Sequence, residues 1–151
     1  MIKRTLLAVA SVAVAVIAVG GMLYVRNTAP VVPVISASDA ANPSKPYVVK
    51  LHAQWCPICM LTKGVWSQVE TTYAGRANFV VFDFTDDATT SASKAEATRL
   101  GLVKFFDENV GATGSISVLD GRSGREMESI QGVHGFDAYR AAIDEGLRKV
   151  E

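Results

Sequence analysis

Tyr47-Val48-Val49-Lys50-Leu51-His52 is followed, two residues later, by Trp55-Cys56-Pro57-Ile58-Cys59. The first of these stretches is rich in β-branched residues, and such runs predict a β-strand. Pro57 suits the first turn of a helix, because its φ is already helical and its missing N–H is not needed there. Two cysteines are therefore expected where a strand passes into the amino terminus of a helix.

Their place on this helix predicts different roles for Cys56 and Cys59. A helix amino terminus presents unpaired N–H groups and the positive end of the helix dipole, which stabilise a thiolate over a thiol. The pKa of a cysteine in such a position commonly falls to about 3.5–7.5. We expect Cys56 to be the exposed, ionised and attacking cysteine. Cys59, one turn further on the same face, can resolve a mixed disulfide formed at Cys56.

Two cysteines at this spacing also occur in metal sites, haem attachment sites and short structural disulfides. A zinc site needs four ligands, and the only histidines that could join the cysteines are His52 and His134. Haem attachment requires a histidine directly after the second cysteine, where this chain has Met60. A disulfide across so short a loop stabilises little. A redox pair is favoured, and binding of Cu(I) or Zn by Cys56 and Cys59, with or without His134, stays open as an alternative.

The remainder of the domain alternates between strand and helix patterns. Two strands that are linked through a helix are expected to pair in parallel, and two that are linked by a turn form an antiparallel hairpin. This order predicts an α/β fold with a central mixed four-stranded sheet flanked by helices. The predicted elements are strands at 47–52, 79–84, 115–119 and 126–131, a turn at 120–124, a helix from Pro57 with the apolar stripe Val65, Trp66, Val69 and Tyr73, helices at 91–100 and 103–110, and a terminal helix with the apolar face Phe136, Tyr139, Ile143, Leu147 and Val150.

The amino-terminal segment predicts the compartment. Lys3 and Arg4 precede the run from Thr5 to Val25, which no charged residue interrupts. As a helix this run would be about 31 Å long, which matches the hydrocarbon thickness of a bilayer. Positive charge at its start favours a cytoplasmic amino end and export of the rest. Residues 1–26 are therefore interpreted as a signal anchor with one transmembrane helix that contacts the lipid bilayer through residues 5–25; a signal peptide cleaved at Ala18-Val19-Gly20 is the alternative.

Residues 27–46 read as a linker between this segment and a domain at 47–151. They contain Pro30, Pro33, Pro43 and Pro46, a density that excludes regular helix and favours extended chain. The domain itself has 11 Lys and Arg against 14 Asp and Glu, a net charge of −3. It carries no basic patch, which argues against nucleic acid as a partner.

Residues 47–59, with a strand that runs into Trp-Cys-Pro-x-Cys, resemble the thioredoxin superfamily, in particular its membrane-anchored, exported members. The resemblance extends through residues 111–115 and Gly132, and covers about 105 residues of the chain. It implies a thioredoxin fold and dithiol–disulfide exchange with exported protein substrates, without a bound cofactor. Cys56 and Cys59 would be the attacking and resolving thiols, and another thiol protein would exchange electrons with them. Anchored relatives usually serve as reductants, which favours the reductase direction.

Two positions depart from the family pattern. The family places a cis-proline beside the redox pair, where Thr113-Gly114-Ser115 puts Gly114, or a shifted match puts Ile116. A non-proline cis bond costs about 2.5–4 kcal/mol, so we predict a trans peptide with a glycine that accepts the resulting φ. Where the family often has a buried acid, this chain has Lys50.

Lys50 either lies beneath the active site, where it favours a thiolate at Cys59, or packs its stem and extends its ammonium to water. Trp55 is expected to shield the cysteines and contact substrate, with ordinary packing as the alternative. His52 and His134 are placed near the rim of the site. Loss of the proline also leaves open an adaptor that has the fold without exchange activity.

Overall fold

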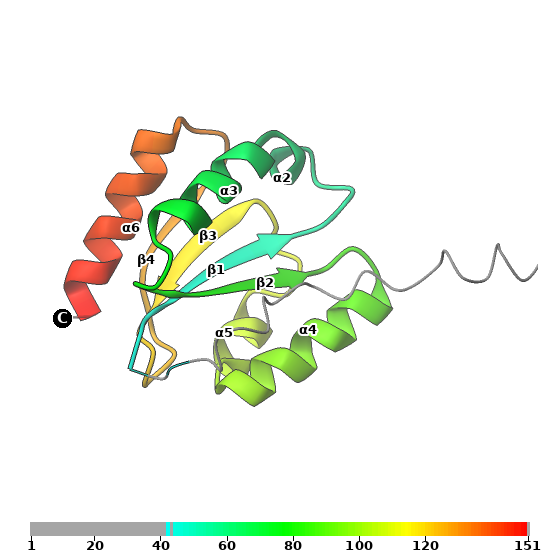
Figure 1. The fold of residues 1–151 in the computed structure, drawn as a ribbon. Helices are drawn as coiled ribbons and strands as arrows, with labels where there is room; N and C mark the ends of the chain where they lie inside the picture. The colour runs from blue at the N-terminus through cyan, green and yellow to red at the C-terminus, as the bar shows by residue number, and fades with distance from the viewer. Residues whose placement is uncertain (1–41, 43, 151) are drawn as a thin grey trace, which may run out of the picture. The chain divides into compact units, whose positions relative to one another are not determined.

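The computed structural model describes residue 42 and residues 44–150 (Figure 1). The predicted signal anchor at 1–26 and most of the linker at 27–46 lie outside the described residues. Within the part of the chain that the structure describes, no helix has both the length and the apolar character of a membrane span.

Four strands form one mixed sheet in the order β2-β1-β3-β4. β1 pairs in parallel with β2 and antiparallel with β3, and β3 pairs antiparallel with β4. The predicted fold class, a mixed four-stranded sheet flanked by helices, is confirmed. The elements are β1 (Tyr47–His52), α2 (Pro57–Leu61), α3 (Lys63–Thr72), β2 (Asn78–Asp83), α4 (Asp87–Leu100), α5 (Val103–Glu108), β3 (Ser115–Leu119), β4 (Glu126–Gln131) and α6 (Phe136–Val150).

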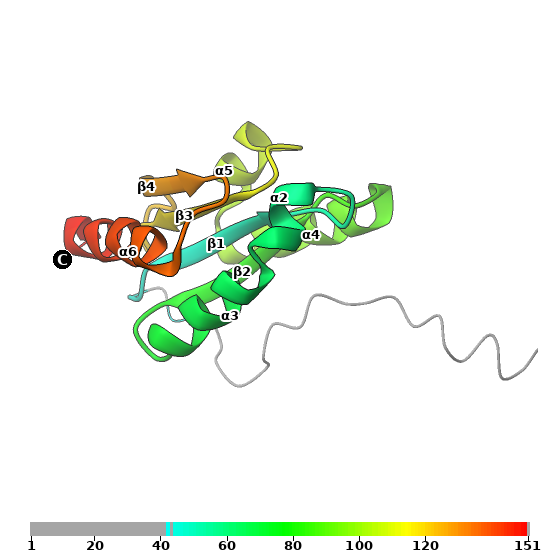
Figure 2. The same cartoon turned by 90° about the horizontal axis from the view of Figure 1, so that it is seen from above.

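Helices cover both faces of the sheet, with α3 and α6 on one face and α4 and α5 on the other (Figures 1 and 2). Alternate residues of β1 supply the two cores, because successive side chains of a strand point to opposite faces. Val49 and Leu51 join the core with Phe106 of α5, whereas Val48 joins the core with Trp66 of α3. β1 is thus buried on both sides, and its carboxyl end delivers the chain directly into the cysteine motif.

The single helix predicted after Pro57 is wrong, since the structure has two helices that meet at Thr62. The Thr62 hydroxyl donates a hydrogen bond to the Ile58 carbonyl at 2.8 Å. A threonine that bonds back to the carbonyl four residues earlier bends a helix. α2 is therefore a five-residue helix that carries the second cysteine, and α3 continues from it in a new direction.

Three other elements have boundaries that differ from prediction for local reasons, and β2 also ends one residue earlier than predicted, at Asp83. α4 begins at Asp87 rather than 91, because Asp86 and Thr89 form a capping box ahead of it. β2 begins one residue earlier than predicted, at Asn78, whose side-chain amide donates to the carbonyls of residues 42 and 45 at 2.9 and 3.1 Å. α5 stops at Glu108 rather than 110, because the Asn109 amide bonds back to the Phe105 carbonyl at 2.9 Å.

Gly146→Ala is expected to destabilise the domain, because α6 packs on β3 at this glycine without room for a methyl group. A Cβ at Gly146 would lie 2.6 Å from the Cβ of Val118. We expect urea titration to show a loss of about 1–3 kcal/mol in the free energy of unfolding. Gly64→Ala in α3 is the control, since a Cβ there meets nothing within 4 Å. Equal effects of the two substitutions would contradict the close contact.

Candidate active site

Cys56 is the N-cap residue of α2, and Pro57 opens the helix as predicted. The backbone of Cys56 is extended, with φ −82° and ψ 113°, so its side chain turns back over the first turn. Its Sγ accepts a hydrogen bond from the backbone N–H of Cys59 at 3.2 Å. Both cysteines are free thiols and form a small cluster with Ala53, against which the half-buried Ile58 packs.

The expectation that Cys56 is exposed is wrong, because the residue is only 3% exposed and Cys59 1%. An N-cap side chain that accepts the helix's own N–H groups is drawn over the helix end and away from solvent. Little of Cys56 is therefore open to solvent.

The surroundings of Cys56 favour its thiolate. Burial raises the pKa of the thiol, but hydrogen bonds from the side chains of Cys59 and Thr113 and from the backbone N–H groups of Cys59 and Ile58 outweigh this effect. The pKa of Cys56 therefore lies below that of an ordinary cysteine. This is the direction that the helix amino terminus predicts from the sequence.

Cys59 is held as a thiol. Burial, together with the hydrogen bond that this thiol gives to Cys56, raises its pKa above the ordinary value, and the opposing effects of the Ala53 backbone and of Lys50 are smaller. The Sγ of Cys59 also lies 3.7 Å from the carbonyl oxygen of Leu51. The two sulfurs thus differ in ionisation, since Cys56 loses its proton first while Cys59 keeps its own.

Lys50 lies under the helices on the α3 face of the sheet and is 6% exposed. Its Nζ is 5.6 Å from the ring centroid of Trp66, which favours a cation–π interaction. Burial lowers the pKa of Lys50 below its ordinary value, although the two cysteines and Glu70 partly oppose this effect. The Lys50 ammonium is therefore not extended into water. It lies beneath the active site, where its charge interacts with the two cysteines.

Lys50→Met is expected to raise the pKa of Cys59 further, because the substitution removes a cation that lowers it. Thiolate absorbance followed against pH in a Cys56→Ser background measures this pKa directly. Lys63→Met, which removes an exposed cation at the start of α3, is the control. An unchanged or lowered pKa of Cys59 in Lys50→Met would show that Lys50 does not act on this thiol.

Trp55 is 60% exposed, directly before the attacking cysteine. Its indole Nε1–H donates to the backbone carbonyl of Thr85 at 3.1 Å. Ordinary packing does not account for so exposed a tryptophan, since most of its side chain lies in solvent.

Gly114 begins the turn into β3 beside α2. Its φ is +86°, and the described residues contain no cis peptide bond, so the predicted trans peptide is confirmed. The N–H of Gly114 donates to the Leu51 carbonyl at 2.9 Å, a bond that proline could not make. The hydroxyl of Thr113 faces Cys56, so the site includes both residues of this turn that the sequence singled out.

The histidines do not complete a metal site. The Nε2 of His134 lies 2.9 Å from the carbonyl oxygen of Gln131, and the Nδ1 of His52 is buried without a hydrogen-bond partner. Among the described residues, no three His, Cys, Asp or Glu side chains are placed so that they could hold a metal ion. In the described part of the chain, His134 is therefore not placed to join the two cysteines as a third ligand.

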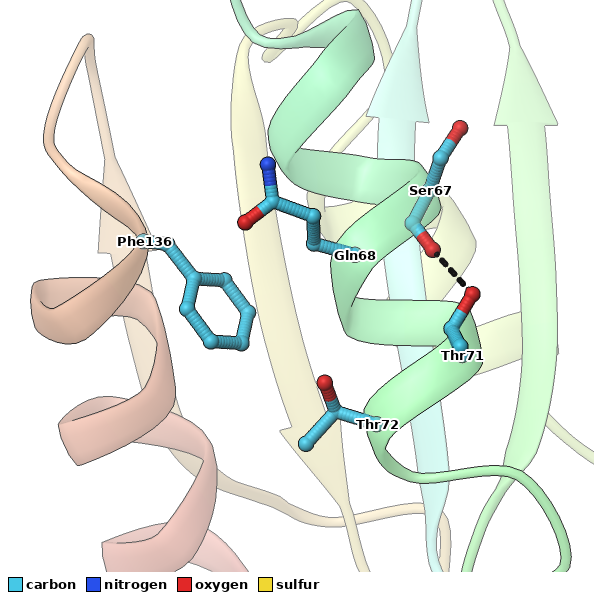
Figure 3. Close-up of a pocket in the computed structure, with 5 residues that line it drawn as sticks. All are labelled: Ser67, Gln68, Thr71, Thr72 and Phe136. Atoms are coloured by element: carbon cyan, nitrogen blue, oxygen red, sulfur yellow. Dashed lines mark hydrogen bonds between the residues drawn. The ribbon is translucent and has the colours of Figure 1, made fainter.

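An open groove of about 310 Å³ lies between α3 and the start of α6 (Figure 3). Phe136 is the one aromatic residue in its lining, and the Thr71 hydroxyl on one side donates to the Ser67 carbonyl at 2.9 Å. Neither cysteine lines it. The lining residues are Ser67, Gln68, Thr71, Thr72 and Phe136.

The sequence pattern of the thioredoxin family matches residues 36–130, which include both cysteines and all four strands apart from the last residue of β4. The chain belongs to the thioredoxin family. The family's general activity is thiol–disulfide exchange. Cys56 and Cys59 of this thioredoxin-family domain lie close together, as that activity requires. A search of curated proteins finds no match to the sequence.

Sequence reasoning missed two groups beside the cysteines. Thr85, just after β2, bonds to the loop that carries Trp55, and Asp83, at the end of β2, accepts a hydrogen bond from the Thr85 hydroxyl. The carboxyl ends of parallel strands meet at one edge of a sheet, and this rule places the end of β2 next to the end of β1. No such rule points to Glu70 of α3. Burial raises the pKa of its carboxyl above the ordinary value, although Trp66 and Lys50 partly oppose this effect.

Proposed function

We propose that this protein is a thiol–disulfide oxidoreductase that exchanges disulfides with exported protein substrates through Cys56 and Cys59. The observation that carries the proposal is the asymmetry of the pair. One sulfur accepts hydrogen bonds at a helix start and has a lowered pKa, while its partner has a raised pKa and donates to it. Such a pair can attack with one thiol and keep the other in reserve.

In the reductive direction, the Cys56 thiolate attacks one sulfur of a substrate disulfide. A Cys56–substrate bond forms, the substrate disulfide breaks, and the other substrate sulfur leaves as a thiolate. Cys59 then gives up its proton and attacks the Cys56 sulfur, which closes the Cys56–Cys59 disulfide and releases the second substrate thiol. The substrate gains two electrons and the pair loses two, so a thiol electron-donor protein, membrane-bound or soluble, must reduce it again.

The surface beside the sulfurs supports a protein as substrate. Trp55, Met60 and Leu61 are 60%, 61% and 70% exposed and come from the loop and helix that carry the cysteines. Exposed apolar side chains that gather in one patch mark sites of protein interaction, and these three lie within seven residues of the chain around the cysteines. A small disulfide would need none of them.

For the location, the proposal is a domain anchored to the membrane and facing away from the cytoplasm, on the periplasmic side in a bacterial cell. The uncharged run at residues 5–25 behind Lys3 and Arg4 supports an anchor, and the linker at 27–46 supplies the reach. Secretion after cleavage of a signal peptide is the alternative. An oxidising compartment also provides the substrates that this chemistry needs.

An equilibrium titration of the full chain in glutathione buffers tests the function. A reversible two-electron transition between dithiol and disulfide is expected, with the potential in the reducing range typical of thioredoxins, about −270 mV. A potential near that of strong oxidants, about −120 mV, would reverse the direction. A pair that forms no disulfide at any ratio would refute exchange and support the adaptor.

A further inference from the structure

We propose that Thr85 is a positioning residue of this active site: its hydrogen bonds hold Trp55 and the turn before Cys56 in the conformation that receives a protein substrate. The inference rests on the proposed function and adds a residue that lies outside the cysteine motif.

Thr85 makes two contacts with the loop that carries the motif. Its hydroxyl accepts a hydrogen bond from the backbone N–H of Gln54 at 2.9 Å. Its backbone carbonyl accepts from the indole Nε1–H of Trp55 at 3.1 Å. One residue thus holds both the backbone of the turn and the ring that stands beside Cys56.

Thr85 is itself fixed by Asp83. A carboxylate oxygen of Asp83 accepts from the Thr85 backbone N–H at 2.8 Å and also from the Thr85 hydroxyl. The backbone N–H of Asp83 in turn donates to the hydroxyl of Ser93 in α4 at 2.8 Å, and Ser93 is 1% exposed. We call the contacts of Asp83, Thr85, Gln54 and Trp55 the Thr85 network. It is attached to the buried Ser93 at one end and reaches the exposed Trp55 at the other.

The network matters because Trp55 is exposed and an exposed indole has several rotamers open to it. Burial cannot select one of them here, so the hydrogen bond to Thr85 does. A ring that is already placed loses less conformational freedom when a substrate packs on it. The residues from Ala53 to Cys56 form a turn, in which the Cys56 N–H bonds to the Ala53 carbonyl at 3.2 Å. Because Thr85 also bonds to Gln54 in this turn, the same network holds the backbone that leads into Cys56.

Thr85→Val keeps the shape of the side chain and removes the hydroxyl. We expect kcat/KM for a protein disulfide such as insulin to fall about five- to tenfold, the effect of losing the hydrogen bond to the Gln54 N–H. The value of kcat/KM for a small disulfide, which does not pack on Trp55, should fall less. Thr85→Ser should restore the wild-type value. Hydrogen exchange of the Trp55 indole N–H should be faster in Thr85→Val than in the wild type or Thr85→Ser.

A double-mutant cycle shows whether Thr85 acts through the tryptophan. Trp55 bonds to the Thr85 carbonyl, which valine keeps, while the hydroxyl holds the Gln54 N–H. In a Trp55→Phe background, Thr85→Val should therefore cause a smaller loss, the part that comes from the turn at Gln54. Wild-type rates for Thr85→Val, or an equal loss for the small and the protein disulfide, would overturn the inference, as would a loss that is undiminished in Trp55→Phe. Failure of the wild type to reduce any disulfide would instead overturn the proposed function.

Discussion

A Cys59→Ser protein is expected to accumulate as a mixed disulfide with its substrate through Cys56. The first attack needs only the Cys56 thiolate, whose remaining hydrogen bonds from the Thr113 side chain and the backbone N–H groups of Cys59 and Ile58 survive the substitution. The second attack needs the sulfur of residue 59, which serine lacks. Turnover of a protein disulfide should fall to the uncatalysed rate, and a reducible adduct should appear on a non-reducing gel.

Cys56→Ser is the matched control, because it removes the attacking sulfur and should trap nothing. The buried Cys59, 1% exposed and with a raised pKa, cannot take over the first attack. Equal trapping by both variants would contradict the assigned roles. Wild-type turnover in Cys59→Ser would place the protein outside two-thiol exchange altogether.

Gly114→Ala is expected to cost about 2–4 kcal/mol of unfolding free energy. The residue has φ +86°, and a Cβ there would lie 2.9 Å from the Cγ2 of Ile58. Ile58 stands between the two cysteines, so its displacement should also slow disulfide exchange. Urea titration and insulin reduction measure the two effects.

Gly111→Ala isolates the contact from the backbone strain. Gly111 has φ +80°, but a Cβ there meets nothing within 4 Å, so the substitution should cost only about 1–2 kcal/mol. Adding Ile58→Ala to Gly114→Ala removes the clashing methyl groups and should recover part of the excess loss. Equal losses for Gly111→Ala and Gly114→Ala would show that Ile58 does not press on this turn.

Local signals were enough for the fold and for the pair of cysteines. The β-branched run at 47–52 matches β1 residue for residue, and Pro57 opens α2 because proline suits that position in any context. The order of strands and helices then predicted a single mixed sheet with a parallel pair and a hairpin, as the structure has it. Even the trans peptide at Gly114 followed from the residue type alone.

The features that adjust the chemistry depend on contacts between residues far apart in the chain. No periodicity or spacing in the sequence predicts three of these features. They are the burial of Cys56, the placement of Lys50 over Trp66, and the bond from Trp55 to Thr85, 30 residues away. The sequence by itself determined which two sulfurs lie together at the start of a helix and on what scaffold, because strand and helix signals act between near neighbours. Only the tertiary structure decided how those sulfurs are covered, charged and approached, because these properties belong to packing across the sheet.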